Sequence, residues 1–176
     1  MKEKIIKDEI IYDGKILKLH IRDVEIGENK IKSKREIVEH KQAICVLPII
    51  NNEIYFVKQF RSGTYLDSIE LPAGLIDENE TPIQACEREL SEEIKYTTSN
   101  LEYIGAYYTS PGFCNELIHF FIATELHEKY LKEDNDELLE IIKYPIESIK
   151  DLLVSNIITD MKTVLLLNIY LNKLNK

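Results

Sequence analysis

Alternating apolar and polar residues predict short antiparallel strands in the first part of the chain. In the stretch 17–21, Leu and Ile alternate with Lys and His, which is the pattern of a strand with one buried face. Asp13-Gly14 and Gly27-Glu28-Asn29 supply turn residues between such stretches. Because a small isolated sheet is marginally stable in water, residues 1–40 are expected to form an appendage that packs against a partner surface.

Longer apolar segments in the rest of the chain predict a mixed α/β domain over residues 41–176. The continuous apolar run Ala43–Ile50 predicts a buried strand, and Asn51-Asn52 predicts a tight turn into a returning strand. Further strands are expected at 53–59, 68–71, 102–108, 117–123 and 139–144, and helices from Pro82, over 146–153 and over 159–174. Helices packed on both faces of a sheet form an α/β/α sandwich, here with a mixed sheet.

The helix that starts at Pro82 has a readable N-terminus. Thr81 is suited to the N-cap, Pro82 to the first helical position, and Gln84 completes a capping box with Thr81. Upstream of the helix, Pro72-Ala73-Gly74 and Asp77-Glu78-Asn79 have the composition of loops.

Three carboxylates crowd the end of this helix. Glu89, Glu92 and Glu93 share one edge of the helix and repel one another by about a few tenths of a kcal/mol per pair. They border an apolar stripe formed by Ile83, Cys86, Leu90 and Ile94. A divalent cation would offset the repulsion, and oxygen ligands of this kind suit magnesium. A solvated acidic helix face is the alternative interpretation.

Charge and composition exclude several classes of partner. A formal net charge of −9 argues against nucleic acids and anionic membranes, which need clustered Lys and Arg. The charged N-terminus has no apolar signal segment, and the run Val164–Leu167 is too short to span a bilayer. Three widely spaced cysteines form neither a zinc pattern nor a disulfide framework. These features predict a protein of a reducing, cytoplasmic compartment.

The spacing around the acidic helix resembles the Nudix box. Gly74 is followed after five residues by Glu80, and after seven more by the segment Arg88–Glu93, a long and specific signature. The sequence departs from the pattern at Lys95, where the family has a glycine. A glycine there ends the helix in a left-handed conformation, which lysine adopts only at a cost of about 1 kcal/mol.

Flanking motifs resemble the ADP-ribose pyrophosphatase branch of the Nudix hydrolases. They are Tyr12-Asp13-Gly14, Lys34–His40, Val57–Arg61, Glu70–Gly74, Ser110-Pro111-Gly112 and Asp160–Thr163. This resemblance implies a homodimeric, magnesium-dependent enzyme that hydrolyses ADP-ribose to AMP and ribose 5-phosphate. Residues 1–40 would then help to form the dimer and the substrate site.

Two alternatives remain open. One is a pyrophosphatase for another nucleoside diphosphate sugar, and the other is a non-catalytic module that senses ADP-ribose. A sensor should have lost box carboxylates or gained a DNA-binding segment. The box glutamates are all present here, and no basic helix-turn-helix pattern occurs, so the enzyme is favoured.

The resemblance also assigns residue roles. Metal ligands would be Glu89, Glu92, Glu93 and the backbone carbonyl of Ala73, holding two or three Mg²⁺ ions, with Mn²⁺ as an alternative. On the substrate side it points to Arg61, Glu70, Pro111 and Gly112. A guanidinium such as that of Arg61 grips a phosphate with two hydrogen bonds, whereas the alternative is an exposed arginine at a strand end.

The general base is expected in the acidic loop 133–137, because the branch uses a glutamate from this region. Glu137 is the first candidate and Asp134 the second, a solvated acidic loop is the alternative, and Glu92 is the remaining candidate on the helix. For adenine stacking the candidates are Tyr12, Tyr65 and Phe113, although a packing role is the favoured interpretation of each.

Overall fold

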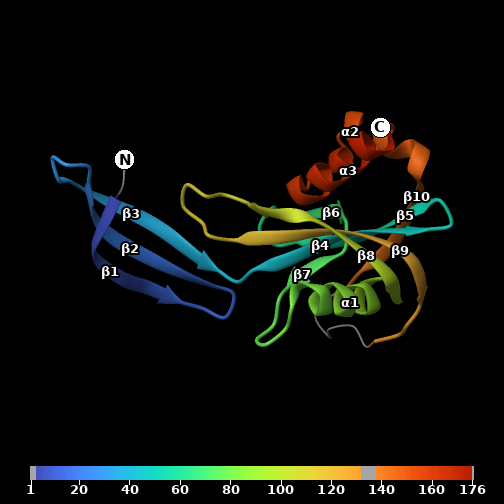
Figure 1. Ribbon diagram of the computed structural model, residues 1–176, viewed down its shortest axis with the longest axis horizontal. Helices are drawn as coiled ribbons and strands as arrows, with labels where there is room; N and C mark the ends of the chain where they lie inside the picture. Colours follow the sequence, from blue (N-terminus) through green and yellow to red (C-terminus); the bar gives the residue numbers. More distant parts are fainter. Residues whose placement is uncertain (1–2, 132–137, 176) are drawn as a thin grey trace. The chain divides into compact units, whose positions relative to one another are not determined.

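The chain folds into two units in a computed structural model that describes residues 3–131 and 138–175 (Figure 1). The first unit comprises Met1–Gln42 and Ala106–Ile118, and the second comprises Ala43–Gly105 and His119–Lys176. The functional assignment of residues 1–40 made from the sequence stays a prediction.

A three-stranded antiparallel sheet forms most of the first unit. Its order is β1 (Glu3–Asp13), β2 (Leu17–Ile26) and β3 (Ile31–His40), joined by turns where the sequence predicts them. His20 and Val24 of β2 are buried, whereas every residue of β1 is exposed. The sheet therefore has little core of its own, in agreement with its expected marginal stability.

A larger sheet organises the second unit. Its strands run in the order β10 (Glu140–Pro145), β5 (Glu53–Arg61), β4 (Ala43–Ile50), β9 (Leu117–Glu128) and β8 (Tyr96–Tyr108), with β6 (Leu66–Glu70) on β5 and β7 (Ala73–Leu75) on β4. The predicted strands are confirmed, although β8 begins at Tyr96 and not at Glu102. Asn51 and Asn52 both have positive φ, as a tight turn between β4 and β5 requires.

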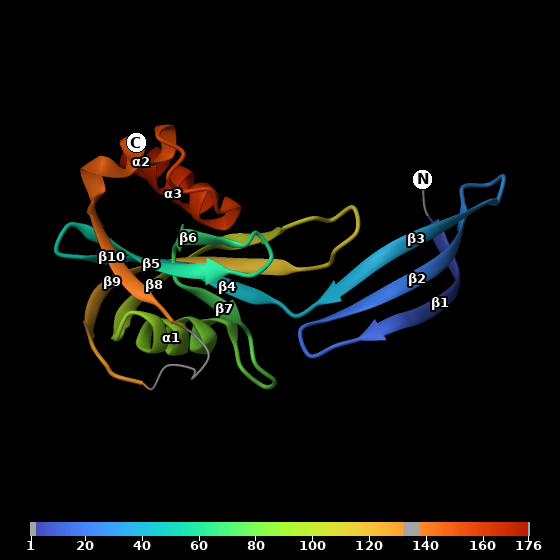
Figure 2. The same ribbon diagram turned by 180° about the vertical axis from the view of Figure 1, so that it is seen from behind.

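Helices cover both faces of this sheet (Figures 1 and 2). The helix α1 (Pro82–Glu93) packs on one face, and α2 (Ile149–Val154) and α3 (Met161–Leu174) lie on the other, with α2 preceded by a short 3₁₀ turn, Ile146–Ser148. The α/β/α arrangement expected from the sequence is confirmed.

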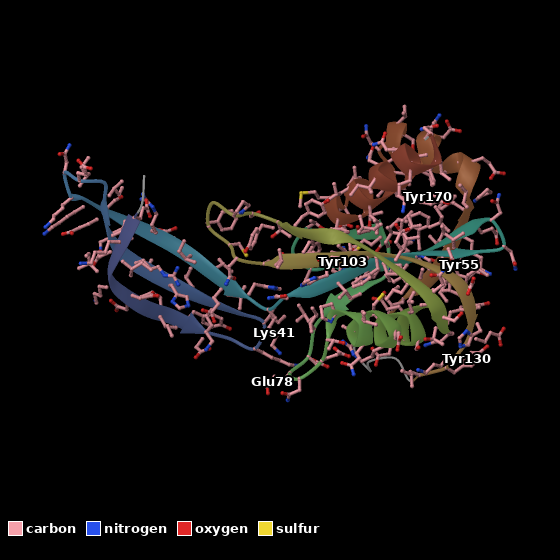
Figure 3. All side chains as sticks on the ribbon, viewed as in Figure 1. Lys41, Tyr55, Glu78, Tyr103, Tyr130 and Tyr170 are labelled. Carbon is pink, nitrogen blue, oxygen red and sulfur yellow. The ribbon has the colours of Figure 1, made fainter. Side chains whose placement is uncertain are left out.

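Apolar side chains fill the space between α1 and the sheet, as Figure 3 shows around Tyr55. Ile44 and Val46 of β4 meet Cys86 and Leu90 of α1 in this core. On the opposite face Leu166 and Leu167 of α3 are fully buried. None of the helices in the described part of the chain is long and apolar enough to cross a membrane.

One element differs from the prediction. Pro72-Ala73-Gly74 was expected as a loop, but Ala73–Leu75 forms the strand β7, which pairs antiparallel with β4. Cys45 lies opposite Ala73 and Ala43 opposite Leu75. Pairing with a buried strand overrides the local preference of Pro and Gly for loops. As a result, Ala73 and Gly74 are held in a fixed position beside α1.

Both ends of α1 are as defined as its sequence suggests. The Thr81 side chain accepts a hydrogen bond from the Gln84 amide at 3.3 Å, and the Gln84 side chain accepts one from the Thr81 amide at 2.8 Å. The predicted capping box is therefore confirmed. After the helix, Lys95 has φ of 66°, so it adopts the left-handed conformation of the family's glycine. Its ammonium group donates to the Glu92 carbonyl at 2.7 Å and caps the helix C-terminus.

Candidate active site

The carboxylates at the end of α1 lie against the strand β7. Glu93 Oε2 accepts a hydrogen bond from the Ala73 amide at 3.1 Å. A Cβ atom added to Gly74 would lie 1.8 Å from Glu89 Oε1, so the carboxylate of Glu89 occupies the space that a side chain would need. Glu89 and Glu93 are both buried. The structure thus brings together three of the predicted metal-site residues, Ala73, Glu89 and Glu93.

Arg88 connects this carboxylate group to the preceding loop. Its guanidinium binds both oxygens of Glu80 at 2.9 Å and donates to the Leu75 carbonyl at 2.9 Å. It also donates to Glu89 at 2.6 Å and to Glu92 at 3.0 Å. Glu92 lies at the (i, i+4) helical spacing from Arg88, whereas Glu80, its bidentate partner, lies before the helix, where helical spacing gives no signal.

The ion pair between Arg88 and Glu80 favours the charged form of both side chains. The hydrogen bond to Glu80 raises the pKa of Arg88, and that same bond lowers the pKa of Glu80 below its usual value. Glu80 also accepts a hydrogen bond from the Asp77 amide at 3.0 Å. Both groups therefore stay charged at neutral pH, and the repulsion among the helix carboxylates is offset in part by a residue of the chain itself.

The oxygen donors beside β7 fit a hard divalent cation. The carboxylate of Glu93 lies against Ala73 and that of Glu89 against Gly74, and Mg²⁺ takes ligands of this kind. Glu92 binds the same guanidinium as Glu89. Within residues 3–131 and 138–175, no three acidic, His or Cys side chains already converge on one ion position. Glu89 and Glu92 each direct an oxygen at Arg88 instead.

A second group of charges surrounds Glu70 at the end of β6. Arg61, at the end of β5, binds both carboxylate oxygens of Glu70, at 2.8 and 2.6 Å. Lys162 of α3 also donates to Glu70 Oε2, and its ammonium group lies 3.1 Å from Asp160. The charge of Glu70 is thus shared between two cations from different elements.

This environment lowers the pKa of Glu70. Burial by itself raises that pKa, but the hydrogen bond from Arg61 and the charge of Lys162 outweigh it and bring the pKa to about 2. The hydrogen bond to Glu70 raises the pKa of Arg61, and the charge of Glu93 adds to this effect. The charged form of Arg61 is therefore favoured chiefly by Glu70 and to a smaller extent by Glu93.

The first turn of α3 ties the strand end after Glu70 to this helix. Asp160 caps α3 by accepting hydrogen bonds from the Thr163 amide at 3.0 Å and the Thr163 hydroxyl at 2.6 Å. The Thr163 hydroxyl oxygen in turn accepts one from the Leu71 amide at 2.8 Å. Nothing local in the segment Asp160–Thr163 signals this contact, because Leu71 lies far from it in the sequence.

The remaining predicted residues lie elsewhere. Pro111 and Gly112 are exposed in the turn between β8 and β9, in the first unit, and their role in substrate binding stays a prediction. Glu137 and Asp134 lie outside the described residues. The three adenine-stacking candidates, Tyr12, Tyr65 and Phe113, are exposed, and the ring of Tyr65 packs edge-on against Phe60. Their role in adenine stacking stays a prediction.

The chain is similar in sequence and in fold to known proteins. The model of the NUDIX domain matches residues 39–165. An ADP-ribose pyrophosphatase of Bacillus subtilis (strain 168) is 40% identical over 166 residues, covering 93% of this chain and 89% of the relative. A GDP-mannose pyrophosphatase of Cronobacter sakazakii is 31% identical over 182 residues, covering 93% and 92%. A crystal structure of an ADP compounds hydrolase shares the fold, with a TM-score of 0.91, 21% identity and coverage of 99% and 95%.

The low pKa of Glu70 makes a prediction about stability in acid. A carboxyl group with a pKa near 2 when folded and 4.5 when unfolded stabilises the fold fully above pH 4.5 and loses this contribution as the pH falls toward 2. The difference in unfolding free energy between the wild type and Glu70→Gln should therefore shrink between those values. Urea unfolding at a series of pH values measures it. A difference that stays constant from pH 5 to pH 2.5 would show that Arg61 and Lys162 do not set the ionisation of Glu70.

Proposed function

This chain belongs to the NUDIX family, and on that premise we propose that it hydrolyses the diphosphate of ADP-ribose to AMP and ribose 5-phosphate with the help of Mg²⁺. Similarity to the Bacillus subtilis ADP-ribose pyrophosphatase supports the substrate. The observation that carries the reaction is the pair of buried carboxylates, Glu89 and Glu93, held against Ala73 and Gly74. Mn²⁺ is the alternative metal.

Glu89, Glu92, Glu93 and the carbonyl of Ala73 would hold two or three metal ions. Bound magnesium neutralises charge on the diphosphate and lowers the pKa of a water molecule that attacks phosphorus. The chain contributes the placement of these ligands. The Ala73 amide orients Glu93, and Arg88 orients Glu89 and Glu92 through separate hydrogen bonds.

Arg61 is proposed to bind the diphosphate. Its side chain is 41% exposed, and its guanidinium already grips a carboxylate in the two-bonded geometry that also fits a phosphate. Pro111 and Gly112 are proposed to contact the rest of the substrate. Glu70 is proposed to act on the substrate indirectly, by holding the guanidinium of Arg61.

A nucleoside diphosphate sugar other than ADP-ribose is the second candidate substrate, and the similarity to a GDP-mannose pyrophosphatase favours it. Incubation with Mg²⁺ and a panel of these compounds, followed by identification of the products, decides between them. AMP and ribose 5-phosphate from ADP-ribose at the highest kcat/KM support the proposal. Preference for GDP-mannose would replace the substrate but keep the reaction, and binding of ADP-ribose with no product would support a sensing module.

A homodimer is proposed in which residues 1–40 bind a second copy of the chain. Four isoleucines of β1 have exposed fractions above one half and would be covered by such contact: Ile5, Ile6, Ile10 and Ile11. Sedimentation of a protein that starts at Lys41 tests this, since a truncated protein that remains dimeric would exclude the role. A cytoplasmic location is also proposed, on the basis of the sequence.

Removal of a metal ligand should abolish most of the activity while leaving the fold intact. Glu93→Gln keeps an acceptor for the Ala73 amide but removes the charge, so kcat should fall on the order of 10²-fold or more. Glu89→Gln should behave alike. Hydrolysis assays with saturating Mg²⁺, accompanied by circular dichroism, measure both effects. Wild-type turnover in either variant would remove that residue from the ligand set.

Gly74 provides a test in which none of the acidic residues is substituted. Gly74→Ala should push the flexible end of Glu89 away from β7 and lower kcat, because the new Cβ would overlap the carboxylate. Gly63→Ala is the matched control, since an added Cβ there has no atom within 4 Å. Equal activity of the two variants would mean that the position of Glu89 beside β7 is not needed for catalysis.

The base is proposed to be Glu137, with Asp134 second and Glu92 third. Glu137→Gln should lower kcat by ~10²- to 10⁴-fold with little change in KM, because a general base acts in the transition state. Asp134→Asn is the comparison, and a larger loss there would assign the role to Asp134. Near-full kcat in both variants would leave Glu92, or no protein base at all.

A further inference from the structure

Two cations compete for a single carboxylate next to the proposed diphosphate site. Glu70 Oε2 accepts hydrogen bonds from both Arg61, at 2.6 Å, and Lys162. The side chain of Glu70 is 3% exposed, whereas that of Arg61 is 41% exposed and that of Lys162 only 14%. The buried carboxylate therefore has one partner near solvent and one inside the protein.

The inner partner is fixed by the helix that carries it. Lys162 lies in the first turn of α3, beside Asp160, whose carboxylate caps this helix and contacts the Lys162 ammonium group. The same turn binds the amide of Leu71, the residue after Glu70. Lys162 and Glu70 are thus held on one framework, while Arg61 reaches Glu70 from the neighbouring strand β5.

Charge counting shows what this arrangement permits. Arg61 and Lys162 supply two positive charges, and Glu70 and Asp160 supply two negative ones. A buried carboxylate that loses its only cation is strongly destabilised, so a lone arginine would be held firmly by Glu70. With Lys162 present, Glu70 keeps a cation when Arg61 turns to another anion.

We propose that Lys162 is a positioning residue that keeps Glu70 compensated, so that Arg61 is free to exchange the carboxylate for a diphosphate oxygen of the substrate. The inference rests on the proposed role of Arg61 in diphosphate binding. Glu70 then acts as the resting partner of Arg61: it holds the guanidinium extended at the end of β5 and releases it when the diphosphate arrives.

Lys162→Met tests this directly. Without the ammonium group, Glu70 should retain Arg61, so the Kd for ADP and the KM for the sugar nucleotide should rise on the order of tenfold, with a smaller change in kcat. Lys162→Arg should restore most of the affinity. Lys173→Met, on the same helix and paired with exposed Glu102, is the matched control and should leave Kd and KM unchanged.

The double variant Lys162→Met with Glu70→Gln separates positioning from simple support of the fold. Removing the charge of Glu70 should free Arg61 again, so ADP should bind within about threefold of the wild type, which is under 1 kcal/mol. A helix that was merely loosened by Lys162→Met would not recover. The proposal is overturned if the double variant binds ADP no more tightly than Lys162→Met does. It is also overturned if Lys162→Met has the same Kd for ADP as the wild type.

Glu70→Gln alone keeps the inference testable if Lys162→Met does not fold. This variant should bind ADP at least as tightly as the wild type, and weaker binding by more than threefold would overturn the proposal. Calorimetry with ADP does not require turnover. A protein that binds ADP in this pattern but fails to hydrolyse ADP-ribose would therefore contradict the proposed substrate and leave the role of Lys162 intact.

Discussion

The compensation of buried negative charge is the constraint on which the second unit depends. Glu70, Glu89 and Glu93 are all buried, and an uncompensated carboxylate in such a place is strongly unfavourable. Glu70 and Glu93 are stabilised by groups from distant parts of the chain, and Glu89 by its neighbour in α1. Arg61 and Lys162 serve Glu70, Arg88 serves Glu89, and the backbone amide of Ala73 serves Glu93. The elements that carry these groups are fixed relative to one another as a consequence.

The short strand β7 is the point where the sheet meets this charge network. Its pairing with β4 fixes the backbone of Ala73 and Gly74, and its last residue, Leu75, presents a carbonyl to Arg88. Glycine at position 74 leaves room for the carboxylate of Glu89. The strand therefore contributes through its backbone and through the absence of a side chain, and both properties depend on its exact register with β4.

Local signals predicted α1 well, and contacts between distant segments account for what was missed. Thr81, Pro82 and Gln84 specify the helix start within a few residues, so the sequence was sufficient there. The strand β7 was missed because its stability comes from β4, which no local pattern of Pro72-Ala73-Gly74 reveals. The contact between Lys162 and Glu70 joins residues 92 positions apart, so no motif spacing encodes it.

Arg88 also bears on whether folding of this region depends on metal binding, since the two are coupled in many metalloproteins. In proteins whose metal-binding acids have no other partner, the metal-free chain is unfolded or loosened, and removal of the metal by a chelator denatures the protein. Here the guanidinium already joins Glu80, Glu89 and Glu92 into one salt-bridged group. An ion bound at the proposed site would therefore compete with an arginine for the same oxygens. We would expect an ion at the proposed site to exchange readily, and so to arrive and leave together with the phosphates of each substrate molecule.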